Sequence, residues 1–215
     1  MSEQAARIGE RQSSKSKHSV KSDPINRRSR SARREEIREQ LEPIFLQEGF
    51  RDLTIDSLAK RLSCSNRTLY SIAPSKEEMF LLVIGQCLDR ALSAGLEGAA
   101  QHEDPVDRIV AYLRPGIVIS GQCGLRCAAD LQSYTPATNM VDNYRNQRLG
   151  FLEKIISSGI QEGSFRAVHP HIVAQIILSS LREFQRNFSE GCSEIPFDEA
   201  TAELYDLVLH GLVLK

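Results

Sequence analysis

The chain has 215 residues, of which 41% are hydrophobic and 26% are charged, a composition typical of one or two soluble globular domains. It contains no long uncharged apolar run and no apolar core of a signal peptide, so the sequence predicts a cytoplasmic protein without a membrane segment. The formal net charge of −1 hides an asymmetry. Residues 1–34 carry ten Lys or Arg against three acids, whereas residues 35–215 carry seventeen against twenty-five.

The basic N-terminal segment is rich in Ser and nearly free of large apolar residues, which predicts a disordered arm over residues 1–29. Arginines gather immediately before the first expected helix, where they can neutralise DNA phosphates or enter a minor groove. A solvated tail without a target is the other interpretation, and we favour it for residues 1–22. The arginines expected to contact the DNA backbone are Arg27, Arg28, Arg30, Arg33 and Arg34.

A first helix is expected from about residue 33 to Glu48, because apolar residues recur at helical spacing and Gly49 follows as a helix-ending residue. Pro43 lies inside this pattern and is expected to kink the helix. A second helix begins after Thr54, whose hydroxyl can cap it, and has one apolar face.

A third, short helix follows a tight turn and is stopped by Pro74. Only Leu69 and Ile72 anchor it, so most of its surface is polar. Such a helix suits the DNA major groove, where Asn66 and Arg67 are the expected base readers, although an ordinary surface helical hairpin has the same pattern. The residues predicted to contact DNA are Thr54, Ser65, Asn66, Arg67, Thr68, Tyr70 and Lys76.

A fourth helix begins after Ser75, where an acid three residues further on gives a capping-box spacing. Lys76 lies in its first turn and, like Tyr70, suits a phosphate contact. This helix is apolar on more than one face, so it is expected to be packed on both sides and to fray at Gly95 and Gly98.

Several positions between residues 33 and 85 share the register of one known pattern: Gly49-Phe50, Leu53-Thr54, Leu58-Ala59, Ser65, Thr68-Leu69-Tyr70 and Pro74-Ser75-Lys76-Glu77-Glu78. In these positions the chain resembles the TetR family of bacterial transcriptional regulators. It departs from the family at Ser63, where Gly is usual, and at Ala73, where a large aromatic is usual. The first departure is expected to strain the turn, because a residue other than Gly disfavours positive φ.

The resemblance implies a dimer, in which the last two helices form a four-helix bundle with those of a second copy. It also implies a small-molecule effector that binds among the middle helices and releases DNA. A two-fold dimer allows the protein to read two half-sites roughly 34 to 36 Å apart on a palindromic double-stranded operator. The alternative is that the last two helices only close the core of a monomer.

The rest of the chain shows helical periodicity and no alternating strand segment, so the fold class is all-α with about nine helices. Pro115-Gly116 is expected to break or kink one helix, and Pro136 to end another. We therefore expect a three-helix, helix-turn-helix DNA-binding domain over residues 30–76. A helical effector-binding and dimerisation domain is expected over residues 77–215.

A few polar side chains beside apolar helical stripes are weak candidates for the effector pocket, although ordinary packing or surface roles are the simpler interpretation. They are Tyr112, Arg126 and Tyr144.

The five cysteines are odd in number and scattered, which favours free thiols in a reducing compartment. Cys123 and Cys127 are four residues apart and, with His169 or His171, are a poor candidate for metal binding or oxidant sensing. Core or surface thiols are the favoured interpretation.

The sequence contains no phosphate-binding loop, nucleophile elbow or paired-histidine motif, so we expect no enzyme activity, metal or cofactor. It predicts a dimeric, ligand-responsive regulator that binds DNA, usually a repressor. Two alternatives remain open. One is an α-helical enzyme or small-molecule carrier that uses a central cavity. The other is a helical interaction module whose basic arm binds nucleic acid or an acidic partner non-specifically.

Overall fold

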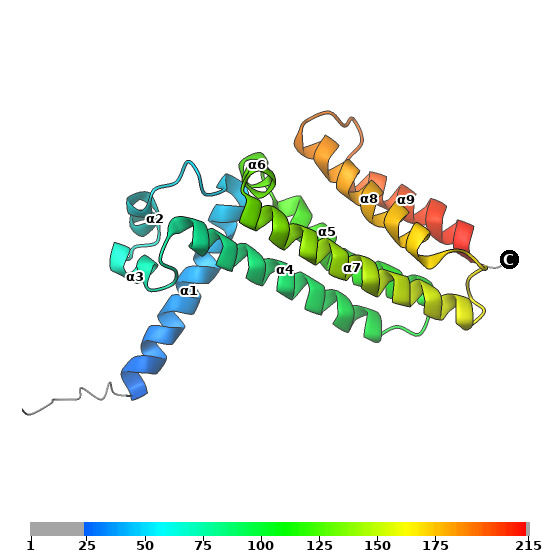
Figure 1. Ribbon diagram of the computed structural model, residues 1–215, viewed down its shortest axis with the longest axis horizontal. Helices are drawn as coiled ribbons and strands as arrows, with labels where there is room; N and C mark the ends of the chain where they lie inside the picture. The colour runs from blue at the N-terminus through cyan, green and yellow to red at the C-terminus, as the bar shows by residue number, and fades with distance from the viewer. Residues whose placement is uncertain (1–23, 214–215) are drawn as a thin grey trace, which may run out of the picture.

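The structure is a computed structural model that describes residues 24–213, with side chains from residue 31 onward except at positions 189 and 198. Over this range the chain forms nine helices and no strand, and one isolated bridge joins Phe165 to Val213. The prediction of an all-α fold is confirmed for this part of the chain. The helices are α1 (Pro24–Glu48), α2 (Ile55–Arg61), α3 (Asn66–Tyr70), α4 (Lys76–Ala100), α5 (Pro105–Gln122), α6 (Leu125–Ser133), α7 (Thr135–Gln161), α8 (Pro170–Ser189) and α9 (Phe197–Leu212) (Figure 1).

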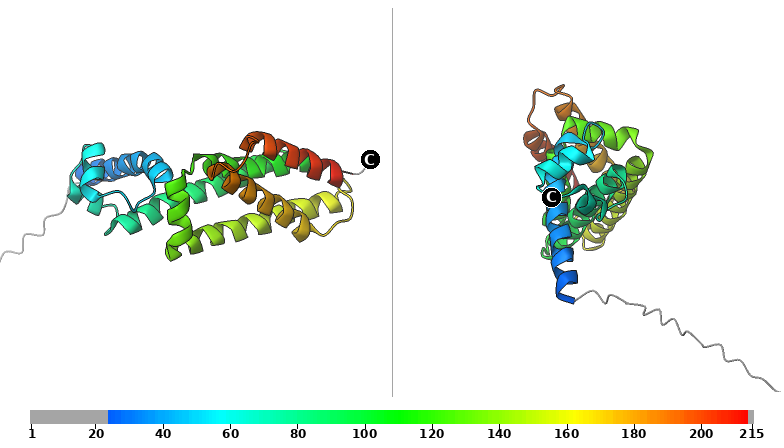
Figure 2. Two further views of the ribbon diagram at one scale, coloured as in Figure 1. Left: turned by 90° about the horizontal axis from the view of Figure 1, so that it is seen from above. Right: turned by 90° about the vertical axis from the view of Figure 1, so that its left-hand side faces the viewer.

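The molecule is elongated, with α2 and α3 at one end and the last turns of α9 at the other (Figures 1 and 2). The long helix α4 runs from the α1–α3 end into the second part, where it packs against α5 and α7. Helix α6 lies across the junction and contacts α1 on one side and α7 on the other. Helices α8 and α9 pack together along one face of the second part.

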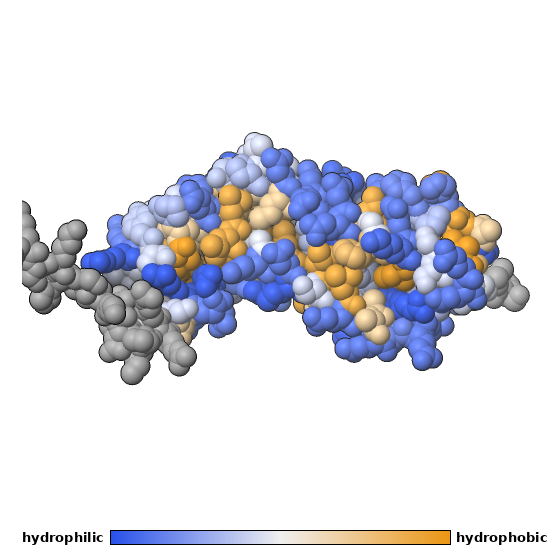
Figure 3. Space-filling view, turned by 60° about the horizontal axis from the view of Figure 1, so that its bottom comes forward, coloured by the Kyte–Doolittle hydropathy of each residue, from blue (hydrophilic) through white to orange (hydrophobic). Residues whose placement is uncertain are grey.

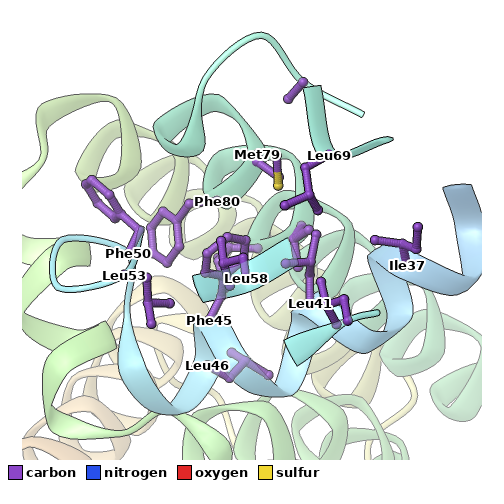
Figure 4. Close-up of a cluster of buried hydrophobic side chains, with 14 of the residues drawn as sticks. Ile37, Leu41, Phe45, Leu46, Phe50, Leu53, Leu58, Leu69, Met79 and Phe80 are labelled. Carbon is purple, nitrogen blue, oxygen red and sulfur yellow. The ribbon is translucent and has the colours of Figure 1, made fainter. Parts of the chain in front are cut away.

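The first part is held by one hydrophobic cluster to which α1, α2, α3 and the start of α4 all contribute (Figure 4). The apolar stripe expected on α1 is confirmed, since Ile37, Leu41 and Phe45 are all buried. The edge of the Phe80 ring packs against Phe45 at a centroid distance of 5.5 Å, which ties α4 to α1. The three helices α1, α2 and α3 make a unit too small to form a sufficient core alone, and it is stabilised by α4, the helix that leads away from it.

Helix α1 begins at Pro24, nine residues before the expected start. Residues 24–29 are thus helical, and the prediction of a disordered arm is wrong for them. Proline suits a first helical turn because its missing N–H has no helical partner there, and arginine is a good helix former. The rest of the expected arm, residues 1–23, lies outside the described range.

Two glycines expected to mark a frayed helix end lie inside α4 instead. A Cβ on Gly95 would stand 2.6 Å from the carbonyl oxygen of Tyr112, and one on Gly98 would stand 3.4 Å from that of Ala111. Both therefore allow α4 and α5 to approach closely, a contact between distant residues that the glycines alone do not reveal.

The expected breaks at two prolines have different outcomes. Helix α5 continues through Pro115-Gly116 without a break. The short helix expected before Pro136 does end there, because α6 stops at Ser133, and Pro136 itself lies in the first turn of α7, where a proline is favoured.

Helix α4 is the one described helix that is long and apolar enough to span a membrane by length and composition. Its apolar side chains instead belong to the protein interior, because Met79, Phe80, Val83, Ile84 and Cys87 are all buried. This agrees with the prediction that α4 is packed on more than one face.

Candidate nucleic-acid interface

Helices α2 and α3 are each started by a capping side chain that the sequence predicts. The Thr54 hydroxyl accepts a hydrogen bond from the Ser57 amide at 3.1 Å, and the Ser57 hydroxyl accepts one from the Thr54 amide at 3.1 Å. The Ser65 hydroxyl accepts from the Thr68 amide at 3.1 Å. Because α3 has only five residues, this cap is a large share of what keeps it helical.

The turn between α2 and α3 contains the backbone strain expected from the sequence. Ser63 has a φ of +48°, in the left-handed region that glycine adopts at no steric cost. The strained turn is maintained by neighbouring backbone bonds, in which the Ser63 and Cys64 amides donate to carbonyls of α2.

The outer face of α3 is polar and solvent-exposed, while its inner face packs against the hydrophobic core. Leu69 is fully buried and Ala73, just beyond the helix, is buried as well. Tyr70 is 51% exposed, and Arg67 is exposed with no hydrogen-bond or ion-pair partner among the described side chains. A rigid helix with an exposed, uncompensated guanidinium can bind an acceptor outside the protein.

Two predicted contact residues are already engaged within the protein. Asn66 donates from Nδ2 to Oδ1 of Asp56 at 2.6 Å, which joins α3 to the start of α2. Thr68 bonds through its hydroxyl to that of Ser65 at 2.9 Å. Each of these side chains would have to share or exchange its partner to reach a base.

Lys76 has a structural role that the sequence did not indicate. Its Nζ donates to the carbonyl oxygens of Leu53 at 2.5 Å and Arg51 at 3.1 Å, and it lies over the Phe50 ring at 5.8 Å from the centroid. The lysine thus holds the α1–α2 loop against the start of α4. An ammonium has three donors, so one N–H remains for a phosphate.

The expected arm arginines extend the polar surface along α1. Arg34 donates from Nε to the Ser71 hydroxyl at 3.1 Å, which places it beside the end of α3. Arg33 pairs with Glu36 at 2.6 Å. Earlier on the same helix are Arg27, Arg28 and Arg30, whose side chains lie outside the described ones.

A buried carboxylate connects this end of the molecule to the second part. Asp130 of α6 is only 4% exposed, and its Oδ2 accepts from the amides of Phe50 at 2.6 Å and Arg51 at 3.2 Å. Gly49 precedes them at a φ of +65°, and a Cβ there would lie 2.3 Å from the same oxygen. Sequence reasoning missed Asp130, although one acid among the apolar positions of α6 was a usable signal.

The weak candidates for an effector pocket do not lie together. Tyr112 is buried, and its hydroxyl donates to the carbonyl oxygen of Arg148 at 3.2 Å. Burial raises the pKa of both Tyr112 and Tyr144, and the two rings lie in the same region of the helical bundle. Arg126 belongs elsewhere, because it is exposed at the domain junction and lies 3.8 Å from a carboxylate oxygen of Asp52.

The described surface has two notable hollows, and neither includes these tyrosines. One, of about 350 Å³, is an open groove between α4 and α5. The other, of about 240 Å³, lies at the domain junction, where the end of α1 meets α5, α6 and the facing ends of α8 and α9.

The described thiols are free, as the sequence predicted. Burial raises the pKa of Cys87 to about 12. A hydrogen bond from Cys127 lowers the pKa of Cys123 and raises that of Cys127. No cluster of three His, Cys, Asp or Glu side chains able to hold a metal occurs in the described part of the chain.

Helices α8 and α9 expose large apolar side chains to solvent. The most exposed is Leu207, at 71%. Elsewhere, on the face seen in Figure 3, hydrophobic surface occurs in patches separated by hydrophilic residues. The exposed apolar side chains of these helices and of the turns next to them are Ile172, Ile176, Phe188, Ile195, Leu207 and Val213.

A capped helix-turn-helix joined by one long helix to a second helical part defines a helix-turn-helix protein with an additional helical domain. No protein-family model matches the sequence, and no curated protein matches it either. Solved structures, in contrast, match most of its length.

Three solved structures illustrate the match. The TetR-family regulator PfmR from Thermus thermophilus is 25% identical, with a TM-score of 0.61 over 81% of this chain and 97% of its own. A candidate transcriptional regulator from Saccharomonospora viridis, in complex with choline, is 17% identical, with a TM-score of 0.75 over 86% and 100%. AibR, in complex with isovaleryl coenzyme A and operator DNA, is 16% identical, with a TM-score of 0.58 over 81% and 97%. The chain therefore has the fold of the TetR-family transcriptional regulators, as the sequence resemblance predicted.

Proposed function

We propose that this protein is a cytoplasmic, sequence-specific DNA-binding transcriptional regulator that inserts α3 into a major groove. The observation that carries the proposal is the geometry of α3. Its inner face is held by a cap and by Leu69, while its outer face presents the exposed Tyr70 and Arg67, which has no partner among the described side chains. Arg67 and Asn66 would read base edges, and Thr54, Ser65, Thr68, Tyr70 and Lys76 would complete the surface.

The first turns of α1 would add non-specific affinity. Arg34 lies beside the end of α3, and the neighbouring arginines follow on the same helix. We propose that this basic stretch contacts the phosphate backbone next to the half-site, which makes binding sensitive to salt. The arginines involved are Arg27, Arg28, Arg30, Arg33 and Arg34.

A homodimer formed through α8 and α9 would give the protein two reading helices. The exposed apolar side chains on these helices support this arrangement, because burying them in a dimer would remove apolar surface from water. A two-fold dimer matches a palindromic operator with half-sites roughly one DNA turn apart.

The second part of the chain would bind a small-molecule effector and so control the occupancy of the operator. Support comes from the neighbours, because one was solved with choline and another with isovaleryl coenzyme A and operator DNA. Repression relieved by the effector is the simplest form of this control. It requires the effector to favour one of two dimer arrangements energetically.

The test is fluorescence anisotropy of the purified protein on DNA from upstream of its own gene, with a random duplex as control and salt varied. We expect specific binding that saturates at two chains per site. Equal binding to both duplexes, lost at moderate salt, would favour a helical module whose basic segment binds nucleic acid non-specifically. Deleting residues 1–30 separates the two further, because a helical module that binds through its basic segment would lose its binding, whereas a helix-turn-helix reader would keep its sequence preference.

A further inference from the structure

The helical bundle contains a group of buried polar atoms that have no hydrogen-bond partner in the described structure. They are Nη2 of Arg148, the hydroxyl of Tyr144 and the hydroxyl of Tyr205. Buried polar groups are nearly always paired, because an unpaired group costs free energy. Three orphaned groups in one region therefore call for a missing partner.

These groups come from different helices and converge on the guanidinium. Tyr144 and Arg148 lie one turn apart on α7, and the Arg148 Cζ is 5.6 Å from the centroid of the Tyr144 ring. Tyr205 projects from α9, where burial raises its pKa and the charge of Arg148 partly offsets that rise, so Arg148 lies within electrostatic range of the hydroxyl. A third tyrosine hydroxyl, that of Tyr112, donates to the Arg148 carbonyl oxygen and is therefore not part of the set.

Gly116 of α5, which has no side chain, leaves room for the Arg148 guanidinium. A Cβ on Gly116 would lie 2.7 Å from Cζ of Arg148 and 2.8 Å from its Nη2. Any other residue at this position would displace the arginine from the backbone of α5. The glycine thus seats a charged side chain in a mostly apolar bundle, where a charge is costly unless it is paired.

No carboxylate of the described chain pairs with Arg148, although nine other arginines in it pair with a carboxylate. The convergent atoms are a cation and two hydroxyl donors, which together fit a negatively charged oxygen group. We propose that the effector of this protein is a small organic oxyanion, whose carboxylate or phosphate binds Arg148, Tyr144 and Tyr205. This inference rests on the proposed regulatory function and specifies its effector.

The test uses probes that share one apolar body and differ only in charge: hexanoate, hexyl phosphate, hexanamide and hexylammonium. Binding to the full chain is measured by calorimetry and by the midpoint of thermal unfolding, without DNA. We expect one or both anions to bind saturably, and the amide and the ammonium not to. The comparison of hexanoate with hexyl phosphate shows which oxyanion the site takes.

Variants assign any anion binding to this site. Arg148→Gln should weaken the anion by roughly tenfold or more, and Tyr205→Phe, which removes only a hydroxyl, should weaken it to a smaller extent. The matched control is Arg145→Gln, which removes the same charge from the exposed side of α7, where Arg145 pairs with Asp142. Arg145→Gln should leave the affinity unchanged. If Arg148→Gln does not fold, Tyr144→Phe and Tyr205→Phe carry the test.

The inference is overturned if the four probes act alike, if neither anion binds at millimolar concentration, or if Arg145→Gln lowers the affinity as much as Arg148→Gln. Failure here is distinct from failure of the proposed function, because operator binding is measured separately. If the protein binds its operator but no anion, only the inference about the effector is wrong, and the proposed regulatory function stands. If anion binding depends on Arg148 but the protein shows no operator preference, the anion site is confirmed and the proposed regulatory function is wrong.

Discussion

At the level of single residues, the polar side chains around α3 fall into those with a partner inside the protein and those without one. Asn66 and Lys76 have partners in Asp56 and in the α1–α2 loop, whereas Arg67 has none among the described residues. Because the Arg67 guanidinium has no such partner, it breaks no hydrogen bond within the described protein when it binds a guanine. Arg67 is therefore the residue most able to contribute specificity.

Replacing Arg67 tests that role. Arg67→Ala should cost about 1–3 kcal/mol on the operator and little on random DNA, because a lost base contact affects only the specific complex. Arg61→Ala is the control, since Arg61 is exposed nearby on α2 but paired with Glu48 at 2.6 Å. Anisotropy titrations on both duplexes make the comparison. An equal loss on specific and random DNA would show that Arg67 contacts phosphate instead.

The strained turn before α3 gives a second test at this scale. Ser63→Gly should stabilise the protein by about 0.5–1 kcal/mol, since the left-handed conformation costs a non-glycine residue about 1–2 kcal/mol and the greater freedom of unfolded glycine offsets part of that gain. Ser63 is exposed, so no packing is lost. Urea unfolding measures the change. A loss of stability would mean that the serine side chain contributes more to the turn than its backbone strain costs.

At the level of the elements, the close contact between α4 and α5 depends on a missing side chain. Gly95→Ala should lower the free energy of unfolding by about 1–3 kcal/mol, because the new methyl group would overlap the Tyr112 carbonyl oxygen. Gly150→Ala is the matched control on α7, where nothing lies within 4 Å of the added Cβ. That variant should gain up to about 1 kcal/mol from helix propensity. Thermal unfolding of both variants would contradict this account if the two shifted in the same direction.

The helix-turn-helix was predictable because its signals are local. The caps at Thr54, Ser65 and Ser75 each join residues three apart, and the apolar stripe of α1 repeats within one helix. The predictions that are wrong concern contacts between residues far apart in the sequence. In the sequence, Gly95 indicates a helix end. Its actual role, which is to let the Tyr112 backbone of another helix come close, depends on a contact that the local sequence does not show.

The candidate site shows the same division. The exposed polar face of α3 could be predicted from its few apolar anchors. The engagement of Lys76 with the α1–α2 loop and the burial of Asp130 could not, because each depends on how separate helices meet. Arg148 was overlooked for the same reason, since its spacing from Tyr144 shows a shared helix face but not what that face meets.

At the level of the whole molecule, the proposed dimer would assemble through the exposed apolar side chains of α8 and α9. Leu207→Asp should convert a dimer to a monomer, because a charge would then have to be buried in an apolar interface. Analytical ultracentrifugation measures the mass, and Glu97→Lys, a charge change at an exposed position on α4, away from α8 and α9 in the chain, is the control. A dimer that survives Leu207→Asp would place the interface elsewhere.

Asp130 of α6 ties the α1–α2 loop to the second part of the molecule. Asp130→Ala leaves the buried Phe50 amide without an acceptor and should cost about 1–3 kcal/mol of stability. Asp142→Ala, which removes an exposed carboxylate paired with Arg145, should cost less than about 1 kcal/mol. Hydrogen exchange should also accelerate selectively at residues 50–53 in the Asp130 variant. Unchanged protection there would mean that α6 does not hold the loop.

The length of α4 has a mechanical consequence. Its 25 residues span about 37 Å at 1.5 Å per residue, with the α1–α2 loop tied to one end and α5 packed along the other. If the bundle end acts as a pivot, a tilt of about 5° displaces the opposite end by about 3 Å. That displacement is close to the rise of one base pair, about 3.4 Å. A rotation small enough for the bundle to absorb without unfolding would thus carry the reading helix almost a full base-pair step along the groove.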